Sequence, residues 1–222
     1  MNKEWSELNQ AMQAQIRKED TWQDGVRTLF ILRNRLMDTL LSFREQLTRE
    51  DFCAIPFLNA DGYHSKTIAY SIWHIFRIED IVAHTLIEGD DQVFFAGNYQ
   101  QRIHSPLITT GNELKKEQIA EFSRQLDLDS LYAYIADVKA STEGILQALP
   151  YRLLKTKPSE ERKENLKALR VVSEAEEAWW LIDYWCGKDI RGLIQMPFSR
   201  HWIMHIEASL RIMNRLHPPR SK

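Results

Sequence analysis

Apolar residues along this chain recur at intervals of three and four residues, which is the spacing of one face of a helix. Intervals of two, which would indicate half-buried strands, do not dominate any segment. The 222 residues include only 8 Gly and 7 Pro, so turn signals are sparse. The pattern predicts an all-α protein.

The first half of the chain contains three of the expected helical regions. One starts at Thr21 in T-W-Q-D, which resembles a capping box, and a separate polar helix at 3 to 18 precedes it. After a loop at 51 to 62, a helix covers 65 to 87 and closes near Gly89. The apolar stripe of the helix that begins at Thr21 consists of Val26, Leu29, Phe30, Leu36, Leu40 and Phe43.

The second half predicts three further helical regions. The first runs from 115 to 149, is interrupted at 126 to 129, and ends at Pro150. The sequence S-E-A-E from Ser173 is a capping box that opens an aromatic-rich helix closed by Gly187. In the last helix, with Ser199 as its N-cap after Pro197, one line carries His201, His205, Ala208, Ile212 and Leu216.

Residues 155 to 168 are the most charged tract, and we interpret them as a solvated surface insertion or linker. The length and the 44% apolar content suit one sizeable core, so we expect residues 1 to 222 to form a single domain. In that domain, 1 to 20 is an N-terminal extension and 150 to 190 is an insertion with an extra helix.

Charge and cysteine content exclude several classes of function. A net charge of -2 gives no positive field for nucleic acid, and no basic helix face suits an anionic membrane. Cys53 and Cys186 have no C-x-x-C spacing, which argues against a disulfide framework and a thiolate zinc site. No signal-peptide pattern and no apolar run of roughly 18 residues occurs, so we expect a cytoplasmic protein.

Sequence motifs of the common enzyme designs are absent. The chain has no G-x-x-x-x-G-K-[ST], G-x-G-x-x-G, G-x-S-x-G or H-E-x-x-H. Nucleotide binding by these loops, the common serine hydrolase design and the commonest zinc protease design are therefore not indicated. The two cysteines offer no argument for a nucleophile, because free cysteines are usually small buried apolar residues.

Two histidines in F-S-R-H-W-I-M-H-I-E, His201 and His205, lie four residues apart on one expected helix. Imidazoles at this spacing lie on one face and can converge on one ion, and imidazole suits zinc, nickel, copper or iron. The spacing alone also fits a pair of packed core histidines. His74, in I-W-H-I-F-R, is a third histidine among apolar neighbours on another helix, where a buried imidazole needs a partner or a metal. We expect a surface role for the other four, His64, His84, His104 and His217.

One histidine in the second bundle helix and H-x-x-x-H near the start of the last helix resemble the pattern of DinB/YfiT-like metal-binding four-helix bundles. The resemblance covers about Thr21 to Leu216. It implies an all-α, DinB-like four-helix bundle, with additional helices at the N-terminus and before the last bundle helix. It also implies a frequent homodimer, and a divalent metal, nickel or zinc, held by His74, His201 and His205 with open positions for water or substrate.

Two departures from the DinB-like pattern leave the reaction open. Many members continue the second histidine of H-x-x-x-H with Arg-Gly-Gln, whereas this chain has Ile206, Glu207 and Ala208. The chain is also longer than a typical member, with the excess at 1 to 20 and at 150 to 190.

A metal held by three neutral imidazoles can make a hydroxide nucleophile from water near neutral pH, which indicates a metal-dependent hydrolase of a small molecule. Glu79, Asp80 and Glu207 are near, but solvated or structural roles suit them better and no catalytic residue is assigned. Some relatives instead activate a low-molecular-weight thiol, so a thiol S-transferase is the second hypothesis.

A thiol cofactor with carboxylates would need cations near the metal, and the candidates for substrate binding are Arg77 and Arg200. The alternative is a non-catalytic bundle, stabilised by metal or sensing it, whose tryptophans at 179, 180 and 185 bind a partner.

Overall fold

The computed structural model describes residues 2–218, apart from the side chain of Glu177, and every regular element in that range is a helix. The all-α prediction is therefore confirmed. No helix in the described range combines the length and the apolar character that crossing a membrane requires. The α-helices are α1 Lys3–Gln15, α2 Trp22–Gln46, α3 Arg49–Cys53, α4 Ile68–Asp80, α5 Val93–Ala96, α6 Tyr99–Arg102, α7 Glu117–Gln125, α8 Leu128–Ala148, α9 Glu160–Ala168, α10 Glu176–Gly187, α11 Ile190–Gln195 and α12 His201–Leu216.

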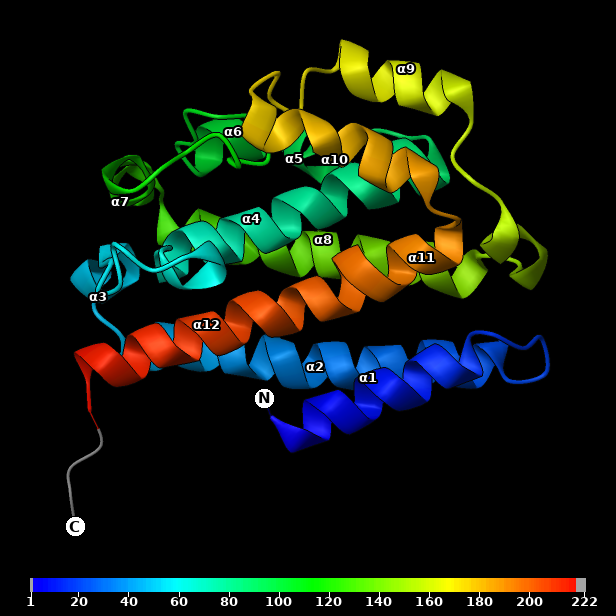
Figure 1. The fold of residues 1–222 in the computed structure, drawn as a ribbon, viewed down its shortest axis with the longest axis horizontal. Coiled ribbons are helices and arrows are strands. Elements are labelled where there is room, and N and C mark those ends of the chain that lie inside the picture. The colour runs from blue at the N-terminus through cyan, green and yellow to red at the C-terminus, as the bar shows by residue number, and fades with distance from the viewer. Residues whose placement is uncertain (1, 219–222) are drawn as a thin grey trace.

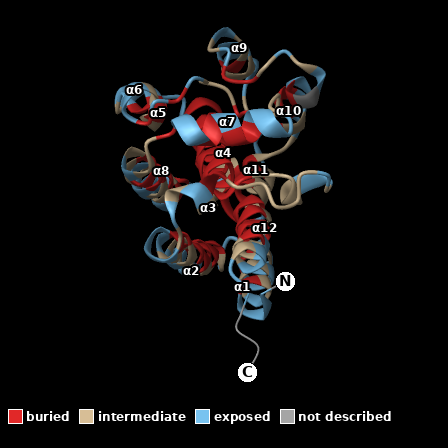
Figure 2. Ribbon diagram, turned by 90° about the vertical axis from the view of Figure 1, so that its left-hand side faces the viewer, coloured by how far each residue is buried: buried red, intermediate tan, exposed pale blue. Residues whose placement is uncertain are grey.

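Four long helices, α2, α4, α8 and α12, form the centre of the molecule (Figure 1). They contact one another in a ring, α2 with α12, α12 with α4, α4 with α8, and α8 with α2. Helix α1 packs along α2 on the outside of this ring. Figure 2 shows the buried residues concentrated on α4 and α12, and every residue of α4 is buried. Helix α4 is thus enclosed on all sides, and its polar residues are buried together with its apolar ones.

The N-terminal half follows the apolar pattern closely, although one cap does not. The expected stripe of α2 faces the core, with only Phe30 partly exposed. The capping box at Thr21 is wrong, because Thr21 Oγ1 donates to the carbonyl of Gln15 and caps no N–H of α2. The region expected to be a loop begins with α3, whose own capping box joins Thr48 and Asp51. The short 3₁₀ helix η1, Gly62–His64, follows it.

Helix α4 continues as a π-helix, η2, over Ile81–Glu88 and ends at Gly89 as predicted. Gly89 has φ +85°, a conformation that favours glycine, and an added Cβ would lie 2.8 Å from Arg162 Nη2. The break expected at 126 to 129 separates α7 from α8, where the Asp127 side chain caps α8. Gly187 is the last residue of α10, also as predicted.

The charged tract at 155 to 168 is not a plain linker. It contains the whole of α9, which follows the 3₁₀ helix η3, Tyr151–Lys155, and buries Leu166. Arg162 reaches back to η2 and donates to the carbonyl oxygens of Leu86, Ile87 and Glu88. These are terminal carbonyls that lack helical partners, so α9 caps the helix that carries His74.

Two expected N-caps in the last third of the chain are wrong, and one of them matters for the site. Ser173 does not cap α10, whose N-cap position is Ala175. Ser199 is not an N-cap either, because α11 runs into α12 through a π-helical segment, η4, at Met196–Arg200. The Ser199 hydroxyl donates back to the Gln195 carbonyl, as a serine inside a helix does.

The π-helical segment η4 sets the direction of α12. Pro197 has no N–H to donate, and the N–H of His201 bonds to the carbonyl of Met196, five residues earlier. The widened turn carries the chain into α12 without a break. His201 is therefore the first residue of α12 and faces the core at the point where the helix is widened.

A buried charged group joins three of the four central helices. Glu79 of α4 accepts hydrogen bonds from Arg33 Nη1 at 2.9 Å and Nη2 at 2.7 Å, and from Trp202 Nε1 at 2.7 Å. The Arg33 and Glu79 side chains have no exposed surface. Arg33 also stacks over the ring of Trp202 and donates to the carbonyl of Phe198 in η4. This group, Arg33–Glu79–Trp202, fixes α2, α4 and α12 relative to one another.

We predict that Glu79→Ala lowers the free energy of unfolding by about 3–5 kcal/mol, because the buried Arg33 guanidinium loses both bonds to Glu79 and, among the described carboxylates, keeps only that of Glu143, which accepts from Arg33 Nε at 3.0 Å. Urea denaturation measures this change. The control is Glu4→Ala, which breaks the exposed ion pair with Arg35 and should cost less than about 1 kcal/mol. Equal losses in the two variants would show that the buried pair does not hold the helices.

Candidate metal centre

Three buried histidines from two helices come together between α4 and α12. His74 lies on α4, and His201 and His205 lie one turn apart on α12. Their ring centroids are 4.6 Å to 5.1 Å apart, and one nitrogen of each ring lies within 4.8 Å of those of the other two. These are the three residues that the sequence singled out. Within the described range, the three rings form a cluster that could hold a metal ion.

The ring of His74 is held in one orientation by its surroundings. Its Nδ1 bonds to the carbonyl oxygen of Thr110 at 2.6 Å, and Tyr70 stacks on it at 5.3 Å between centroids. Because a carbonyl only accepts, Nδ1 carries the proton and Nε2 keeps a free lone pair. In metal-binding histidines, a hydrogen bond from the ring nitrogen that does not bind the metal fixes the tautomer of the ring. The arrangement fits His74 as a ligand through Nε2.

The loop that supplies the Thr110 carbonyl depends on Gly111. Its φ of +76° favours glycine, and an added Cβ would lie 2.9 Å from the ring of Trp73. The Tyr70 hydroxyl donates to the Gly111 carbonyl at 3.0 Å and closes the contact between α4 and the loop. The position of His74 Nδ1 is therefore set by a loop that the sequence did not identify as part of the site.

The other two histidines have buried ring nitrogens without partners. Among the described residues, no hydrogen-bond partner is present for either ring nitrogen of His205 or for Nδ1 of His201. Buried polar atoms in proteins are nearly always satisfied, so three such nitrogens in one cluster need an explanation. A metal ion bound through one nitrogen of each ring would account for one nitrogen of His201 and one of His205, and it leaves the second nitrogen of His205 without a partner. The donor set of three imidazoles fits zinc, nickel, copper or iron.

Burial keeps the three imidazoles neutral. It lowers the pKa of His74 to about 4, with a further lowering by the charge of Lys66 that the Thr110 hydrogen bond opposes. Burial also lowers the pKa of His201 and of His205 well below the ordinary value, and repulsion within the cluster adds to the effect. Neutral imidazole is the form that binds metal, so the cluster is in its binding form at neutral pH.

A cavity of about 270 Å³ opens onto the histidine cluster. Besides the three histidines, its walls come from η1, from the loop at Asn112, from α10 and from the η4 segment. Most of the wall is apolar or aromatic, formed by Tyr63, Ile78, Trp180, Leu181, Tyr184, Trp185, Met196 and Pro197. The site therefore joins three potential metal ligands to a space for a small molecule.

Two polar groups of the cavity wall make no hydrogen bond within the described part of the chain. These are the hydroxyl of Tyr63 and the side-chain amide of Asn112. The Tyr63 ring meets that of His205 edge-on, 4.7 Å between centroids, and burial raises the pKa of its hydroxyl. The hydroxyl is therefore protonated at neutral pH and can donate to a molecule in the cavity. Sequence reasoning missed both residues, because neither the short 3₁₀ helix η1 that contains Tyr63 nor the loop at Asn112 carries a motif.

The structure does not bring Arg77 to the cavity. Its Nε and Nη2 donate to the carbonyl of Ile108, its Nη1 lies 3.5 Å from Asp80, and its guanidinium stacks over Phe94. It is fully buried in these contacts and is absent from the cavity wall. Arg200 is exposed and also lies outside the wall, although its charge acts on Tyr63.

The acidic residues on α4 serve the fold and not the site. Glu79 is used by Arg33 and Trp202, as described above. Asp80 accepts from the backbone N–H groups of Val93 and Phe94 and from the hydroxyl of Tyr134. Both lie off the His74 face, as expected, yet both are buried and not solvated.

The remaining histidines have other partners. His84 is buried, which corrects the surface role expected for it. Its Nδ1 bonds to Asp90 and its Nε2 to the Ser141 hydroxyl. His64 accepts from Arg211, and His217 lies 3.0 Å from Asp51. His104 is exposed and has a positive φ.

Ser141, His84 and Asp90 have the order of contacts found in serine hydrolases, with Ser141 Oγ 3.1 Å from His84 Nε2 and His84 Nδ1 2.6 Å from Asp90. Ser141 lies inside α8, however, where the backbone N–H groups are used by the helix. No pair of free donors is therefore present to stabilise an oxyanion at this serine. We interpret the contacts as structural, joining η2, α8 and the turn after Gly89.

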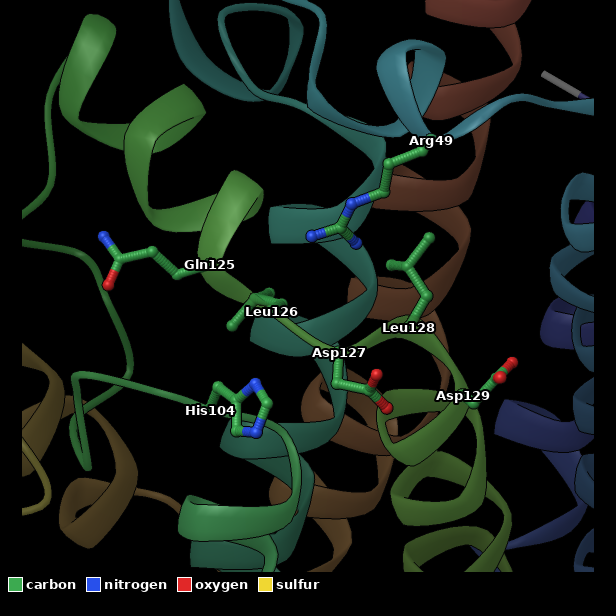
Figure 3. Close-up of a pocket in the computed structure, with 7 residues that line it drawn as sticks. All are labelled: Arg49, His104, Gln125, Leu126, Asp127, Leu128 and Asp129. Carbon is green, nitrogen blue, oxygen red and sulfur yellow. The ribbon is translucent and has the colours of Figure 1, made fainter.

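Two features away from the histidines carry no chemistry of their own. Figure 3 shows an open hollow of about 410 Å³ between the loop at His104 and the start of α8. Its polar groups are already used, since Arg49 donates to the Arg124 carbonyl and Asp127 caps α8. Cys53 and Cys186 are free, and burial raises the pKa of both thiols. Neither is an activated nucleophile.

No model of a known protein family matches this chain, and no curated protein is significantly similar to it. The DinB-like assignment therefore stays a prediction that rests on the three histidines and their helices.

We predict that the chelator-treated protein loses stability as the pH falls from 6.5 toward 4. In the unfolded chain His74 has a pKa near 6.5, whereas in the folded protein its pKa is about 4. Between these two values the unfolded chain binds a proton at this position and the folded protein does not, so lowering the pH favours unfolding. Thermal melting at pH 7 and pH 5 measures the loss. His74→Gln should lose less than the wild type, whereas the control His64→Gln should match it. An unchanged loss in His74→Gln would contradict the assignment.

We also predict that His201→Ala abolishes stoichiometric binding of Zn²⁺ or Ni²⁺, because only two imidazoles remain. Elemental analysis of protein purified without an affinity tag and dialysed against the metal measures the stoichiometry. His84→Ala removes a buried histidine that lies outside the cluster and should retain one equivalent. Full metal content in His201→Ala would refute the site.

Proposed function

We propose that this protein is a DinB-like metal-dependent hydrolase of a small molecule, with one divalent ion, zinc or nickel, bound by His74, His201 and His205. The observation that carries the proposal is the set of three neutral, buried imidazoles that line one cavity and offer one nitrogen each within 4.8 Å of the other two. When bound, such an ion lowers the pKa of a coordinated water and polarises a substrate carbonyl or phosphoryl oxygen.

The chain's own residues would orient the substrate and stabilise developing charge. The Tyr63 hydroxyl and the Asn112 amide are the donors that the cavity wall offers. Tyr63 keeps its proton because burial raises its pKa, so it donates to a substrate oxygen and does not act as a base. Closure of the wall by α10 reduces the access of bulk water to the site, which strengthens these hydrogen bonds.

The cavity favours hydrolysis over transfer to a thiol that carries carboxylates. Such a thiol would need cations, yet no Lys or Arg side chain belongs to the described wall. Arg77 is committed to Ile108 and Asp80, and Arg200 is exposed outside the wall. The non-catalytic alternative relied on tryptophans that bind a partner, but Trp180 and Trp185 belong to the cavity. A homodimer stays a prediction.

The test is hydrolysis of a panel of small uncharged esters, amides and phosphotriesters by metal-loaded protein. We predict activity that chelation removes and that added zinc or nickel restores. Tyr63→Phe should lower kcat about 10²–10³-fold, as loss of one oxyanion donor does, while one equivalent of metal stays bound.

The matched control for that test is Tyr151→Phe, whose hydroxyl donates to the Arg17 carbonyl far from the cavity. It should leave kcat unchanged. Metal-independent turnover, or equal loss in the two tyrosine variants, would overturn the proposal.

A further inference from the structure

The wall of the cavity opposite the histidines is built largely by one helix, α10. Trp180, Leu181, Tyr184 and Trp185 all line the cavity. Their spacing of one, four and five residues places them on one side of the helix. The rings of Trp180 and Tyr184 meet edge-on, 5.5 Å between centroids. Helix α10 lies in the segment between α8 and α12 and crosses over α4 (Figure 1).

The aromatic side chains of α10 differ in their exposed fraction. Trp185 is fully buried and anchors the helix, whereas Trp180 borders the cavity and is 53% exposed. Trp179, its neighbour in sequence, is 40% exposed and does not line the cavity. Large exposed aromatic surface at the mouth of a cavity costs free energy unless a ligand covers it. Trp180 is therefore the wall residue with the most surface to gain from a bound molecule.

The charge of the wall restricts what that molecule can be. Among the described wall residues there is no Asp, Glu, Lys or Arg, so an ionised group on the body of a ligand would be desolvated without a partner. A metal ion bound by the histidines would be a positive charge in the wall, so a metal-binding donor atom fits at that end of the cavity.

The size of the cavity adds a second restriction. Its volume of about 270 Å³ lies just below the usual range for pockets that hold drug-sized ligands, roughly 300–1,000 Å³. One ring with a short substituent fits such a space. The aromatic wall suits a flat ring, which can stack on or meet the edges of Trp180 and Tyr184.

We infer that α10 is the substrate-selecting wall of the site, and that the ligand is an uncharged single-ring or short apolar molecule with one metal-binding atom at its end. The inference rests on the proposed metal site for the position of that atom. It adds the chemical class of the ligand, and it names Trp180 as the residue that selects the ligand.

The test compares two alkyl thiols that have the same metal-binding sulfur but differ in the rest of the molecule. Benzyl mercaptan has an uncharged ring, and mercaptosuccinate has two carboxylates. Isothermal titration of each into cobalt-loaded and metal-free protein gives the dissociation constants, and a sulfur-to-cobalt charge-transfer band reports contact with the metal. We expect benzyl mercaptan to bind at least tenfold more tightly, as burial of a phenyl ring allows.

Two variants on the same helix show whether α10 is responsible. Trp180→Ala should weaken benzyl mercaptan about tenfold, because it removes the exposed ring at the cavity mouth, and Trp179→Ala should leave its affinity unchanged. Both side chains are exposed enough for the fold to survive, which melting curves verify. Trp179→Ala is thus the control. Tyr184→Ala, at the neighbouring wall position, is the second wall variant and should act like Trp180→Ala.

The outcomes separate this inference from the proposed function. Tighter binding of mercaptosuccinate, equal effects of Trp179→Ala and Trp180→Ala, or no binding of benzyl mercaptan to either form would overturn the inference. If the protein takes up no cobalt, the metal site fails. Preference for benzyl mercaptan that depends on Trp180 in the metal-free protein would still support α10 as the selecting wall.

Discussion

The rest of the structure depends on the carboxylate of Glu79, which is fully buried and accepts three hydrogen bonds, two from Arg33 and one from Trp202. Burying a carboxylate is costly unless its acceptor sites are filled, so α2 and α12 can pack on α4 only in the register that brings both donors to it. Trp202 directly follows His201, and Glu79 lies five residues after His74. The register that satisfies the charge is therefore the register in which the histidines of α4 and α12 meet.

Local features then orient the rings within that register. The π-helical segment η4 carries α11 into α12 and makes His201 its first residue, and Arg33 binds a carbonyl of the same segment at Phe198. On the other helix, the loop around Gly111 presents the Thr110 carbonyl to His74 Nδ1. Global packing brings the imidazoles together, and the contact with Thr110 leaves Nε2 of His74 free to bind a metal. The apolar cavity beside them explains why the three rings are neutral and why a small apolar ligand suits the site.

Much of this could be predicted from the sequence, because helical periodicity, Gly89 and Gly187 as helix ends and the three histidines are local signals. The buried charges could not, since Glu79, Asp80 and Arg33 look like surface residues until the partners, far away in the sequence, are known. For the same reason His84 was expected at the surface and Arg77 in the site. Thr21 is the N-cap residue of α2, but its capping box was wrong because its hydroxyl bonds to the Gln15 carbonyl. The N-caps at Ser173 and Ser199 were wrong because α10 has Ala175 in its N-cap position and because α11 continues into α12 through η4. Tyr63 lies in a three-residue 3₁₀ helix and Asn112 in a loop, and segments this short have no periodicity that would predict which way a side chain points.

The most direct test of the account is the position of a metal in crystals of the zinc- or nickel-loaded protein, located by anomalous scattering at the absorption edge of that metal. The account predicts one strong peak bonded to Nε2 of His74 and to a ring nitrogen each of His201 and His205, at about 2.0–2.1 Å for zinc. Strong density at His84 or at surface histidines, with none among these three rings, would contradict it.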